Sequence, residues 1–309
     1  MADMTDKTKA EYAKLAGHFI YERIGKHGKR ATAKTLRDAL LACAGEYRPV
    51  YWRKLRCALA YAQDFGGFKE TAAELRALKN PITKDGDLTK IKQKERRVKS
   101  ISMDDEVKLI NCVAERGDRQ LFAALFIVTT TGVRPTEIKD LAVVDGVLVV
   151  KGAKQSHGGQ RGADRRLQFD ADTTRKLAAC IGTLKGGDVG PLQDRLRRVC
   201  KALWPRRQAV PTLYTWRHQM GGDLKASGRS RQEVAYIMGH QATDSVDSYG
   251  NRRTARGGGV TPGIPKDVDL SAVRETHNVK GAKGYQPAKA AKPKKAAKPR
   301  KAPDSGFSM

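Results

Sequence analysis

The spacing of apolar residues predicts that residues 5–79 are helical throughout. Apolar side chains recur at helical intervals in successive stripes, the first over residues 12–24 and the third over residues 51–62. The dipeptide Asn80-Pro81 interrupts this pattern, because the residue before a proline is disfavoured in a helix. We therefore expect a small helical domain over residues 1–79.

A polar and basic segment with little apolar periodicity follows over residues 80–100, which is typical of an interdomain linker. Ser102 and Asp105 then form a helix N-cap signature, so a second domain is expected over residues 101–255. Asp145-Gly146 predicts a type I′ turn between two short strands within residues 141–150. With a third strand at residues 165–169 and helices from 171 to 248, the expected fold is mainly α with a small antiparallel β-sheet.

The composition changes after residue 255. A glycine- and proline-rich stretch precedes residues 267–279, where one short helix is expected. From residue 280 to 301 the chain has nine Lys or Arg residues and no acidic residue, interleaved with Ala and Pro. Such a composition cannot bury a core, so residues 280–309 are predicted to be a disordered basic tail.

The formal net charge of +27 over 309 residues calls for a polyanionic partner, of which nucleic acid is the best candidate. Binding to a membrane surface would require a basic amphipathic helix with aromatic anchors, and the sequence shows none. No apolar stretch is long enough for a transmembrane helix, and the first residues lack the apolar core of a signal peptide.

The cysteine pattern argues against a disulfide framework and against a zinc site. The chain has five cysteines, an odd number, and no CxxC spacing. Free thiols are typical of a reducing compartment, so a cytoplasmic protein is expected. No grouping of His, Cys, Asp and Glu has metal-ligand spacing, and the glycine-rich stretch matches no nucleotide-binding motif. We therefore predict no metal and no cofactor.

Four short segments of the second domain carry candidate chemistry. They are TGVRPTEI at residues 131–138, VKGAK at 150–154, LYTWRH at 213–218, and MGH at 238–240 with Tyr249 nine residues later. In this order they resemble the motifs of the tyrosine recombinases, the family of phage integrases and Xer-type recombinases. The helical first domain is similar to the core-binding domain of that family in size and position.

The resemblance implies a role for each matched residue. Arg134 and Arg217 would hold the scissile phosphate, His240 would contact it, Lys151 would protonate the leaving oxygen, Tyr249 would be the nucleophile, and Glu137 would orient Arg134. A metal-free site can stabilise the charge of a phosphoryl transition state with two bidentate guanidinium groups, which lysine cannot replace.

One position departs from the family pattern. Tyr214 stands where the family usually has a histidine, three residues before Arg217. A phenol can donate a hydrogen bond to phosphate, but it is a poorer proton shuttle near neutral pH. His218 is expected to point elsewhere, because it lies one residue beyond Arg217 on a helix.

Further basic residues are predicted to contact double-stranded DNA. They are Lys54 and Arg56 in the helical domain, Lys94, Arg96 and Arg97 in the linker, Lys154, Arg161 and Arg165 in the hairpin region, and Lys294 and Lys295 in the tail. Binding through many phosphates predicts an affinity that falls steeply with salt.

The sequence therefore predicts a site-specific recombinase that acts through a 3′-phosphotyrosyl intermediate. The family resemblance implies a dimer on each DNA site, a synaptic tetramer that passes through a Holliday junction, and 256–279 as a segment that packs on a neighbouring protomer. Two alternatives stay open. One is an enzyme like the type IB topoisomerases, and the other is a non-catalytic DNA-binding protein with a recombinase-like fold.

Overall fold

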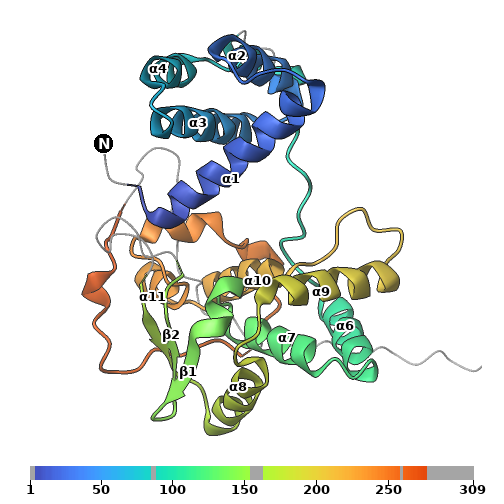
Figure 1. Cartoon of the computed structure of the whole chain (residues 1–309). Helices are drawn as coiled ribbons and strands as arrows, with labels where there is room; N and C mark the ends of the chain where they lie inside the picture. Colours follow the sequence, from blue (N-terminus) through green and yellow to red (C-terminus); the bar gives the residue numbers. More distant parts are fainter. Residues whose placement is uncertain (1–3, 85–87, 154–162, 258–259, 277–309) are drawn as a thin grey trace, which may run out of the picture. The chain divides into compact units, whose positions relative to one another are not determined.

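The structure is a computed structural model that describes residues 4–84, 88–153, 163–257 and 260–276 (Figure 1). The chain divides into two compact units, Met1–Arg96 and Arg97–Met309. Both are mainly helical, and the second holds a three-stranded antiparallel sheet, which is the fold class that the sequence predicts. No helix within these described ranges is long and apolar enough to cross a membrane.

The first unit is a small helical bundle. Its helices are α1 (Asp6–Arg23), α2 (Ala33–Ala42), α3 (Pro49–Phe65), α4 (Lys69–Ala77) and the single turn α5 (Pro81–Lys84), with short 3-10 turns at Gly25–His27, Cys43–Gly45 and Leu88–Lys90. Thr5 and Thr32 cap α1 and α2 through their side chains, and Pro49 occupies the first turn of α3. Phe19, Leu36 and Leu55 are buried in its core, as the apolar stripes predict, whereas Trp52 is buried in place of the predicted Tyr51, which is exposed.

The second unit surrounds a helix that is apolar on all sides. Its elements are α6 (Met103–Glu115), α7 (Arg119–Thr131), η4 (Pro135–Asp140), β1 (Leu141–Val144), β2 (Val147–Val150), β3 (Arg165–Leu167), α8 (Ala171–Leu184), α9 (Val189–Leu203), α10 (Leu213–Ala226), α11 (Arg231–Ile237), η5 (Thr243–Ser248), η6 (Arg252–Thr254) and η7 (Leu270–Ala272). Leu121, Leu125 and Val128 of α7 are 0–1% exposed, so this helix forms the centre of the core. The segment that leaves α7 therefore starts inside the protein.

The sheet has the strand order β1-β2-β3, with both pairs antiparallel. Asp145 and Gly146 join β1 to β2 with φ angles of 49° and 75°, which are the left-handed conformations that a type I′ turn requires. Ser102 caps α6 by accepting a hydrogen bond from the Asp105 amide. The predicted hairpin and the predicted start of α6 are thus both confirmed.

The short helix expected at 267–279 is not formed between residues 267 and 276. This stretch contains one 3-10 turn at Leu270–Ala272, flanked by Asp269 and Val273 in extended conformation, and no α-helix. The carboxylate of Asp269 accepts hydrogen bonds from the amide and hydroxyl of Ser271, and such local bonds compete with helix formation. The segment packs on its own chain, through bridges from Gly263 to Gln168 and from Arg274 to Ala242. The predicted tail, residues 280–309, lies outside the described residues.

Candidate active site

The first arginine motif folds as a sharp turn at the end of the buried helix α7. Gly132 ends the helix with a φ of 62°, and a Cβ at this position would lie 2.5 Å from Cγ of Met220. Only glycine fits this turn, because it tolerates both the left-handed backbone and the close approach of α10. The turn places Arg134 at the start of η4, where the side chain is 8% exposed.

Glu137 holds Arg134 in place through two hydrogen bonds. Its carboxylate accepts one from the Arg134 guanidinium at 2.6 Å and one from the Arg134 backbone amide at 2.8 Å. Glu137 is fully buried, which by itself would raise the pKa of its carboxyl group. The charges and hydrogen bonds of Arg165 and Arg134 outweigh burial and lower this pKa to about 2. Glu137 thus contacts Arg134 directly, and its role in orienting Arg134 for catalysis stays a prediction.

Arg165 does not lie at the surface, so its prediction as a DNA contact is wrong. Its side chain is 0% exposed. Its guanidinium donates to the Glu137 carboxylate at 2.8 Å and to the Ile237 carbonyl at 2.8 Å. Arg165 alternates with exposed Arg166 along β3, and the side chain on the inward face of a strand is buried. The positive charge of Arg165 instead neutralises the Glu137 carboxylate, which also binds Arg134.

Arg217 is the second guanidinium of the cluster and is fully buried on α10. It donates to the Gly132 carbonyl at 3.0 Å, two residues before Arg134, and to the Met238 carbonyl. Arg134 reaches the adjacent Gly239 carbonyl at 3.4 Å, so both arginines bind the same turn. Burial and the neighbouring arginines lower the pKa of Arg217 to about 10, which leaves it charged at neutral pH.

His240 follows this turn and is 5% exposed. Its Nε2 lies 3.3 Å from the Arg217 guanidinium, and its ring centre is 5.0 Å from that of Tyr249. Burial and the charges of Arg217 and Arg134 lower the pKa of His240 to about 2, so the imidazole is neutral. Its Nδ1 has no hydrogen-bond partner within the described residues.

Tyr249 lies against the same cluster. The Arg217 guanidinium carbon is 4.8 Å from the centre of its ring. Gly250 has a φ of 59°, and a Cβ there would lie 2.2 Å from the Gly222 amide nitrogen on α10. Lys225 donates to the carbonyl oxygens of Tyr249 and Gly250 at 2.5 and 3.1 Å. The backbone around Tyr249 is therefore fastened directly onto α10.

The two tyrosines form a hydrogen-bonded pair, since the hydroxyl of Tyr214 lies 2.8 Å from that of Tyr249. Burial raises the pKa of Tyr249, but the hydrogen bond from Tyr214 and the charge of Arg217 outweigh it, so the net shift is downward. Burial and the same hydrogen bond raise the pKa of Tyr214. Tyr214 thus contacts the oxygen of Tyr249, where the sequence analysis expected a contact to phosphate.

His218 does not point elsewhere, as the sequence analysis expected. Its ring centre lies 5.2 Å from that of Tyr249 and 5.5 Å from that of Tyr214. The spacing of four residues from Tyr214 was the available signal, because residues i and i+4 share a helix face. Burial and nearby cations lower the pKa of His218 to about 4, so it is neutral at physiological pH.

Lys151 follows the last residue of β2 and is exposed. Its neighbour Gly152 donates to the Asp164 carboxylate at 2.8 Å, and Ala153 donates to Glu137 at 3.5 Å, which anchors the start of the loop beside the cluster. In the described part of the chain, no hydrogen bond or ion pair joins Lys151 to the arginines or tyrosines. Lys154 and Arg161 lie outside the described residues.

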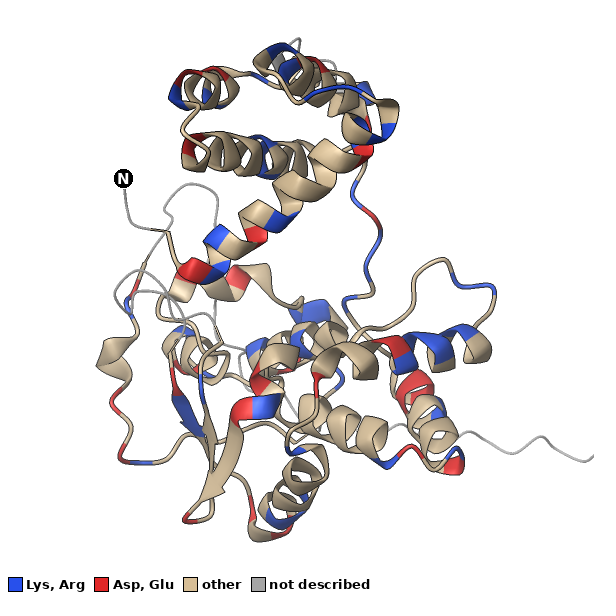
Figure 2. Ribbon diagram, viewed as in Figure 1, with Lys and Arg blue, Asp and Glu red and all other residues tan. Residues whose placement is uncertain are grey.

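The remaining predicted DNA contacts differ in their surroundings. Lys54 forms an ion pair with Glu11, and the Arg56 guanidinium donates to the Leu78 carbonyl. Figure 2 shows basic residues along the extended segment that leads to α6, and the three predicted contacts there, Lys94, Arg96 and Arg97, are all exposed. Lys294 and Lys295 lie outside the described residues.

Comparison with solved structures relates this fold to known proteins. A lambda integrase dimer bound to a COC′ core site aligns with a TM-score of 0.55 and 18% identity over 83% of this chain and 74% of that chain. For a lambda integrase tetramer bound to a Holliday junction, the TM-score is 0.52, the identity 20%, and the coverage 77% and 72%. For the Tn1549 transposon integrase in complex with transposon right end DNA, the values are 0.51, 14%, 80% and 90%.

No family model matches the sequence, and a search of curated proteins finds no match either. The structural likeness nevertheless shows that the chain has the tyrosine recombinase fold, as the resemblance of its motifs predicts. At these identities the likeness concerns the fold alone.

Proposed function

We propose that this chain is a site-specific DNA recombinase that cleaves and rejoins strands through a 3′-phosphotyrosyl intermediate. The observation that carries the proposal is the Tyr249 ring lying 4.8 Å from the guanidinium carbon of Arg217, in one cluster with Arg134 and His240. These groups come from three separate segments of the sequence, namely those of Arg134, of Arg217, and of His240 with Tyr249. A purely structural arginine cluster would not need a half-buried pair of tyrosine hydroxyls beside it.

The two arginines supply the charge that phosphoryl transfer requires. The carbonyl and carboxylate partners of Arg134 and Arg217 hold the two guanidinium groups in fixed positions. The Nε atoms of both are buried and have no partner among the described residues, so each arginine keeps one donor that no described protein group uses. Prearranged donors stabilise the transition state without reorganisation at the moment of reaction. Neutral His240 adds one further hydrogen-bond donor.

In the proposed cleavage step the Tyr249 oxygen attacks phosphorus, and the bond from phosphorus to the 5′-oxygen breaks. The phenolic proton passes to solvent, and the hydrogen bond from Tyr214 stabilises the developing phenolate. Lys151 protonates the leaving 5′-oxygen. The hydrogen bonds of Gly152 and Ala153 hold the start of the loop, and with it Lys151, near the cluster. Religation reverses these steps with another strand's 5′-hydroxyl, so no metal or external energy source is required.

The proposed partner is double-stranded DNA, bound by a dimer on each site and by a tetramer at synapsis. The similar lambda integrase structures are described as a dimer on a core site and a tetramer on a Holliday junction. The net charge of +27 supports binding to a polyanion.

A single substitution tests the chemistry. Tyr249→Phe removes the nucleophilic oxygen and keeps the ring against Arg217, so duplex binding is expected to stay while covalent adducts on a nicked suicide substrate disappear. Tyr21→Phe, at an exposed tyrosine of α1, is the matched control and should form adducts like the parent chain. Adducts that persist in Tyr249→Phe would reject the assignment.

A non-catalytic DNA-binding protein is the second candidate. It is favoured by Tyr214 in place of the usual histidine and by an exposed Lys151 that does not contact the cluster. Tight duplex binding by the parent chain without any adduct, on substrates that span its own binding site, would favour this candidate over the recombinase.

A further inference from the structure

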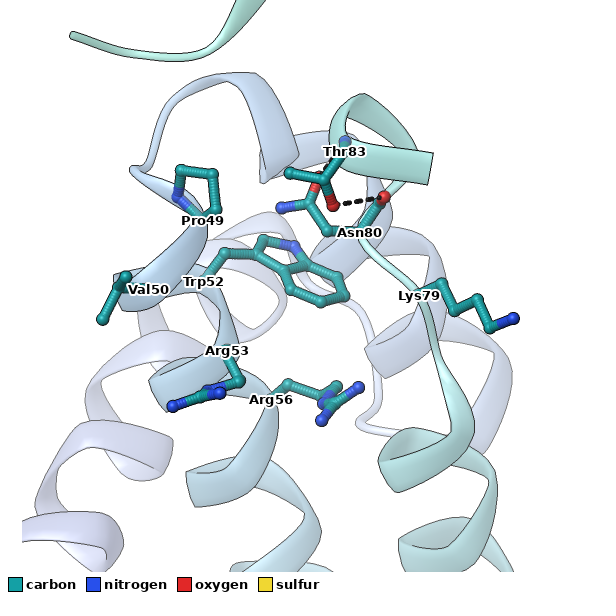
Figure 3. Close-up of a pocket in the computed structure, with 8 residues that line it drawn as sticks. All are labelled: Pro49, Val50, Trp52, Arg53, Arg56, Lys79, Asn80 and Thr83. Carbon is teal, nitrogen blue, oxygen red and sulfur yellow. Dashed lines mark hydrogen bonds between the residues drawn. The ribbon is translucent and has the colours of Figure 1, made fainter. Parts of the chain in front are cut away.

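A pocket in the first unit, remote in sequence from the tyrosine cluster, has the chemistry of an anion site (Figure 3). It has a volume of about 460 Å³ and lies between α3 and the segment that follows α4. Its walls include Trp52, Arg53 and Arg56 of α3 and Lys79 and Asn80 of that segment. No acidic side chain is among the described residues that line it.

Two of the three cations that line the pocket share one face of α3. Arg53 and Arg56 are three residues apart, so their side chains lie on the same side of the helix. The Arg56 guanidinium is held by the Leu78 carbonyl and lies 6.0 Å from the Trp52 ring, while its Nε has no partner among the described residues. Arg53 is exposed beside it. Lys54 belongs to a different face and is paired with Glu11.

Asn80 contributes a donor whose direction is fixed. Its Oδ1 accepts hydrogen bonds from the backbone amides of Ile82 and Thr83 at 3.0 and 3.4 Å. The Nδ2 group therefore has to be on the other side of the amide, where Figure 3 shows it facing the Trp52 side of the pocket. Asn80 is 8% exposed, and its Nδ2 has no partner within the described residues. A buried donor without a partner is unfavourable unless a ligand accepts from it.

One wall of the pocket is apolar, and the hydroxyl of Thr83, which also lines the pocket, already donates to the Asn80 carbonyl at 3.2 Å. The Trp52 indole is buried, and its Nε1 already donates to the Leu40 carbonyl at 2.7 Å. Pro49 and Val50 complete this wall, and Val50 is 70% exposed at the rim. An anion that binds to the arginines and Asn80 therefore fits best if it carries an apolar group that can pack against this wall. A backbone phosphodiester meets this condition, because its phosphate is joined to deoxyribose.

We propose that this pocket seats one backbone phosphodiester of the duplex, with Arg53 and Asn80 as its main contacts and Arg56 behind them. The inference rests on the DNA-binding part of the proposed function and gives it a point of contact in the first unit. The pocket positions the strand and takes no part in the cleavage chemistry. A phosphate contact of this kind acts on all sequences alike.

Three variants of the full chain test the pocket, and each has a net charge that is one unit lower than that of the parent. Asn80→Asp keeps the oxygen that accepts from Ile82 and Thr83 and replaces only the Nδ2 donor, so the fold should be retained. Arg53→Ala removes the exposed cation of the pocket. Arg76→Ala is the control, since it removes an exposed cation of α4 that does not line the pocket and is paired with Asp64.

The measurement is the affinity for a duplex of about 30 base pairs as salt is varied. For Asn80→Asp and Arg53→Ala the slope of log K against log salt should fall by about 0.9, the contribution of one phosphate. Arg76→Ala should keep the parent slope. Parent-like slopes for Asn80→Asp and Arg53→Ala, or an equal loss in Arg76→Ala, would overturn the pocket assignment.

The same experiment separates this inference from the recombinase proposal. A parent chain that binds the duplex but forms no adduct would overturn strand exchange and leave the pocket test valid. A parent chain that does not bind duplex DNA at all would overturn both. Adduct formation with pocket variants that bind like the parent would overturn the pocket alone.

Discussion

At the scale of single residues, the contact between Tyr214 and Tyr249 is the feature that sets this site apart from the usual family pattern. A histidine at position 214 would exchange protons near neutral pH, whereas a phenol there donates a hydrogen bond without titrating. Its hydroxyl lies 2.8 Å from the proposed nucleophile. With tyrosine at position 214, the hydrogen bond goes to the oxygen of Tyr249, whereas the usual histidine is expected to contact the phosphate. We therefore infer that Tyr214 is a positioning residue for Tyr249.

Tyr214→Phe should move the pH dependence of cleavage to higher pH. Removing the hydroxyl removes a hydrogen bond that lowers the pKa of Tyr249, so less phenolate is present at a given pH. Each unit by which this pKa rises lowers the phenolate fraction at neutral pH about tenfold. Single-turnover adduct formation between about pH 6 and pH 9 measures the shift. An unchanged profile would show that Tyr214 does not act on Tyr249.

Glu137→Gln should lower the free energy of unfolding by about 3–5 kcal/mol near neutral pH, because it leaves buried Arg134 and Arg165 without their carboxylate. The folded-state pKa of Glu137 is depressed from 4.5 to about 2. Its contribution is therefore complete above about pH 4.5 and is lost as the pH falls toward 2. Urea unfolding of both proteins should show their difference shrinking across that range. A constant difference would contradict the ion-pair account.

At the scale of elements, two glycine contacts decide where the tyrosine segment lies. Gly250 and Gly221 bring the chain onto α10, since a Cβ on Gly221 would meet Cβ of Tyr249 at 3.0 Å. The ammonium of Lys225 binds the adjacent carbonyls from the same helix. This close approach brings Tyr249 next to Tyr214 and Arg217, two residues of α10.

Gly250→Ala should reduce adduct formation by tenfold or more while duplex binding persists. The added Cβ would lie 2.2 Å from the Gly222 amide nitrogen, so the tyrosine segment must leave α10. Misplacing a reacting group by about 1 Å is enough for a loss of about a hundredfold. Gly257→Ala is the matched control, because Gly257 also has a positive φ but nothing lies within 4 Å of its Cβ position. Equal activity of both variants would argue against the docked segment.

The sequence predicted local elements and motif order well, for definite physical reasons. Asp145-Gly146 specifies its turn through backbone preference, and Ser102 specifies the start of α6 through its own hydroxyl. Neither depends on distant residues. Arg165 was misplaced because its burial depends on Glu137 and on the Ile237 carbonyl, which are far away in the chain. A charged residue on a short strand carries no local sign that it faces the interior.

The position of His218 and the missing helix after residue 267 show the same limit. Helical spacing places His218 on the same face of α10 as Tyr214. It does not show that Tyr249 docks on that face, and this docking is what brings Tyr249 into contact with His218. The stretch from 267 to 276 follows neighbours on its own chain, including an ion pair between Arg166 and Asp267. Long-range contacts of this type decide the conformation of short segments with weak propensity.

At the scale of the whole molecule, the charge of +27 is the property that the proposed function uses most directly. The exposed residues Lys94, Arg96 and Arg97 and the proposed phosphate pocket supply cations in two separate places. Binding through about six to ten phosphates lowers affinity by about a thousandfold or more between about 50 and 200 mM salt.

Lys294→Gln combined with Lys295→Gln should weaken duplex binding and reduce the salt slope by about 1.8, if each lysine neutralises one phosphate. Cleavage of bound substrate should stay at the parent rate, because the two residues lie beyond the folded catalytic elements in the sequence. Fluorescence anisotropy over a salt series gives the slope, and single-turnover assays at saturating protein give the rate. A parent-like slope would show that these lysines do not contact DNA.

The most direct test of the central claim is to identify the amino acid that becomes attached to DNA. Adducts trapped on a nicked suicide duplex can be digested and their nucleotide-linked peptide sequenced by mass spectrometry. We predict a 3′-phosphotyrosyl bond on Tyr249. Attachment to Tyr214, whose hydroxyl is only 2.8 Å away, or to any other residue would contradict the account, as would the absence of an adduct from a chain that binds its site.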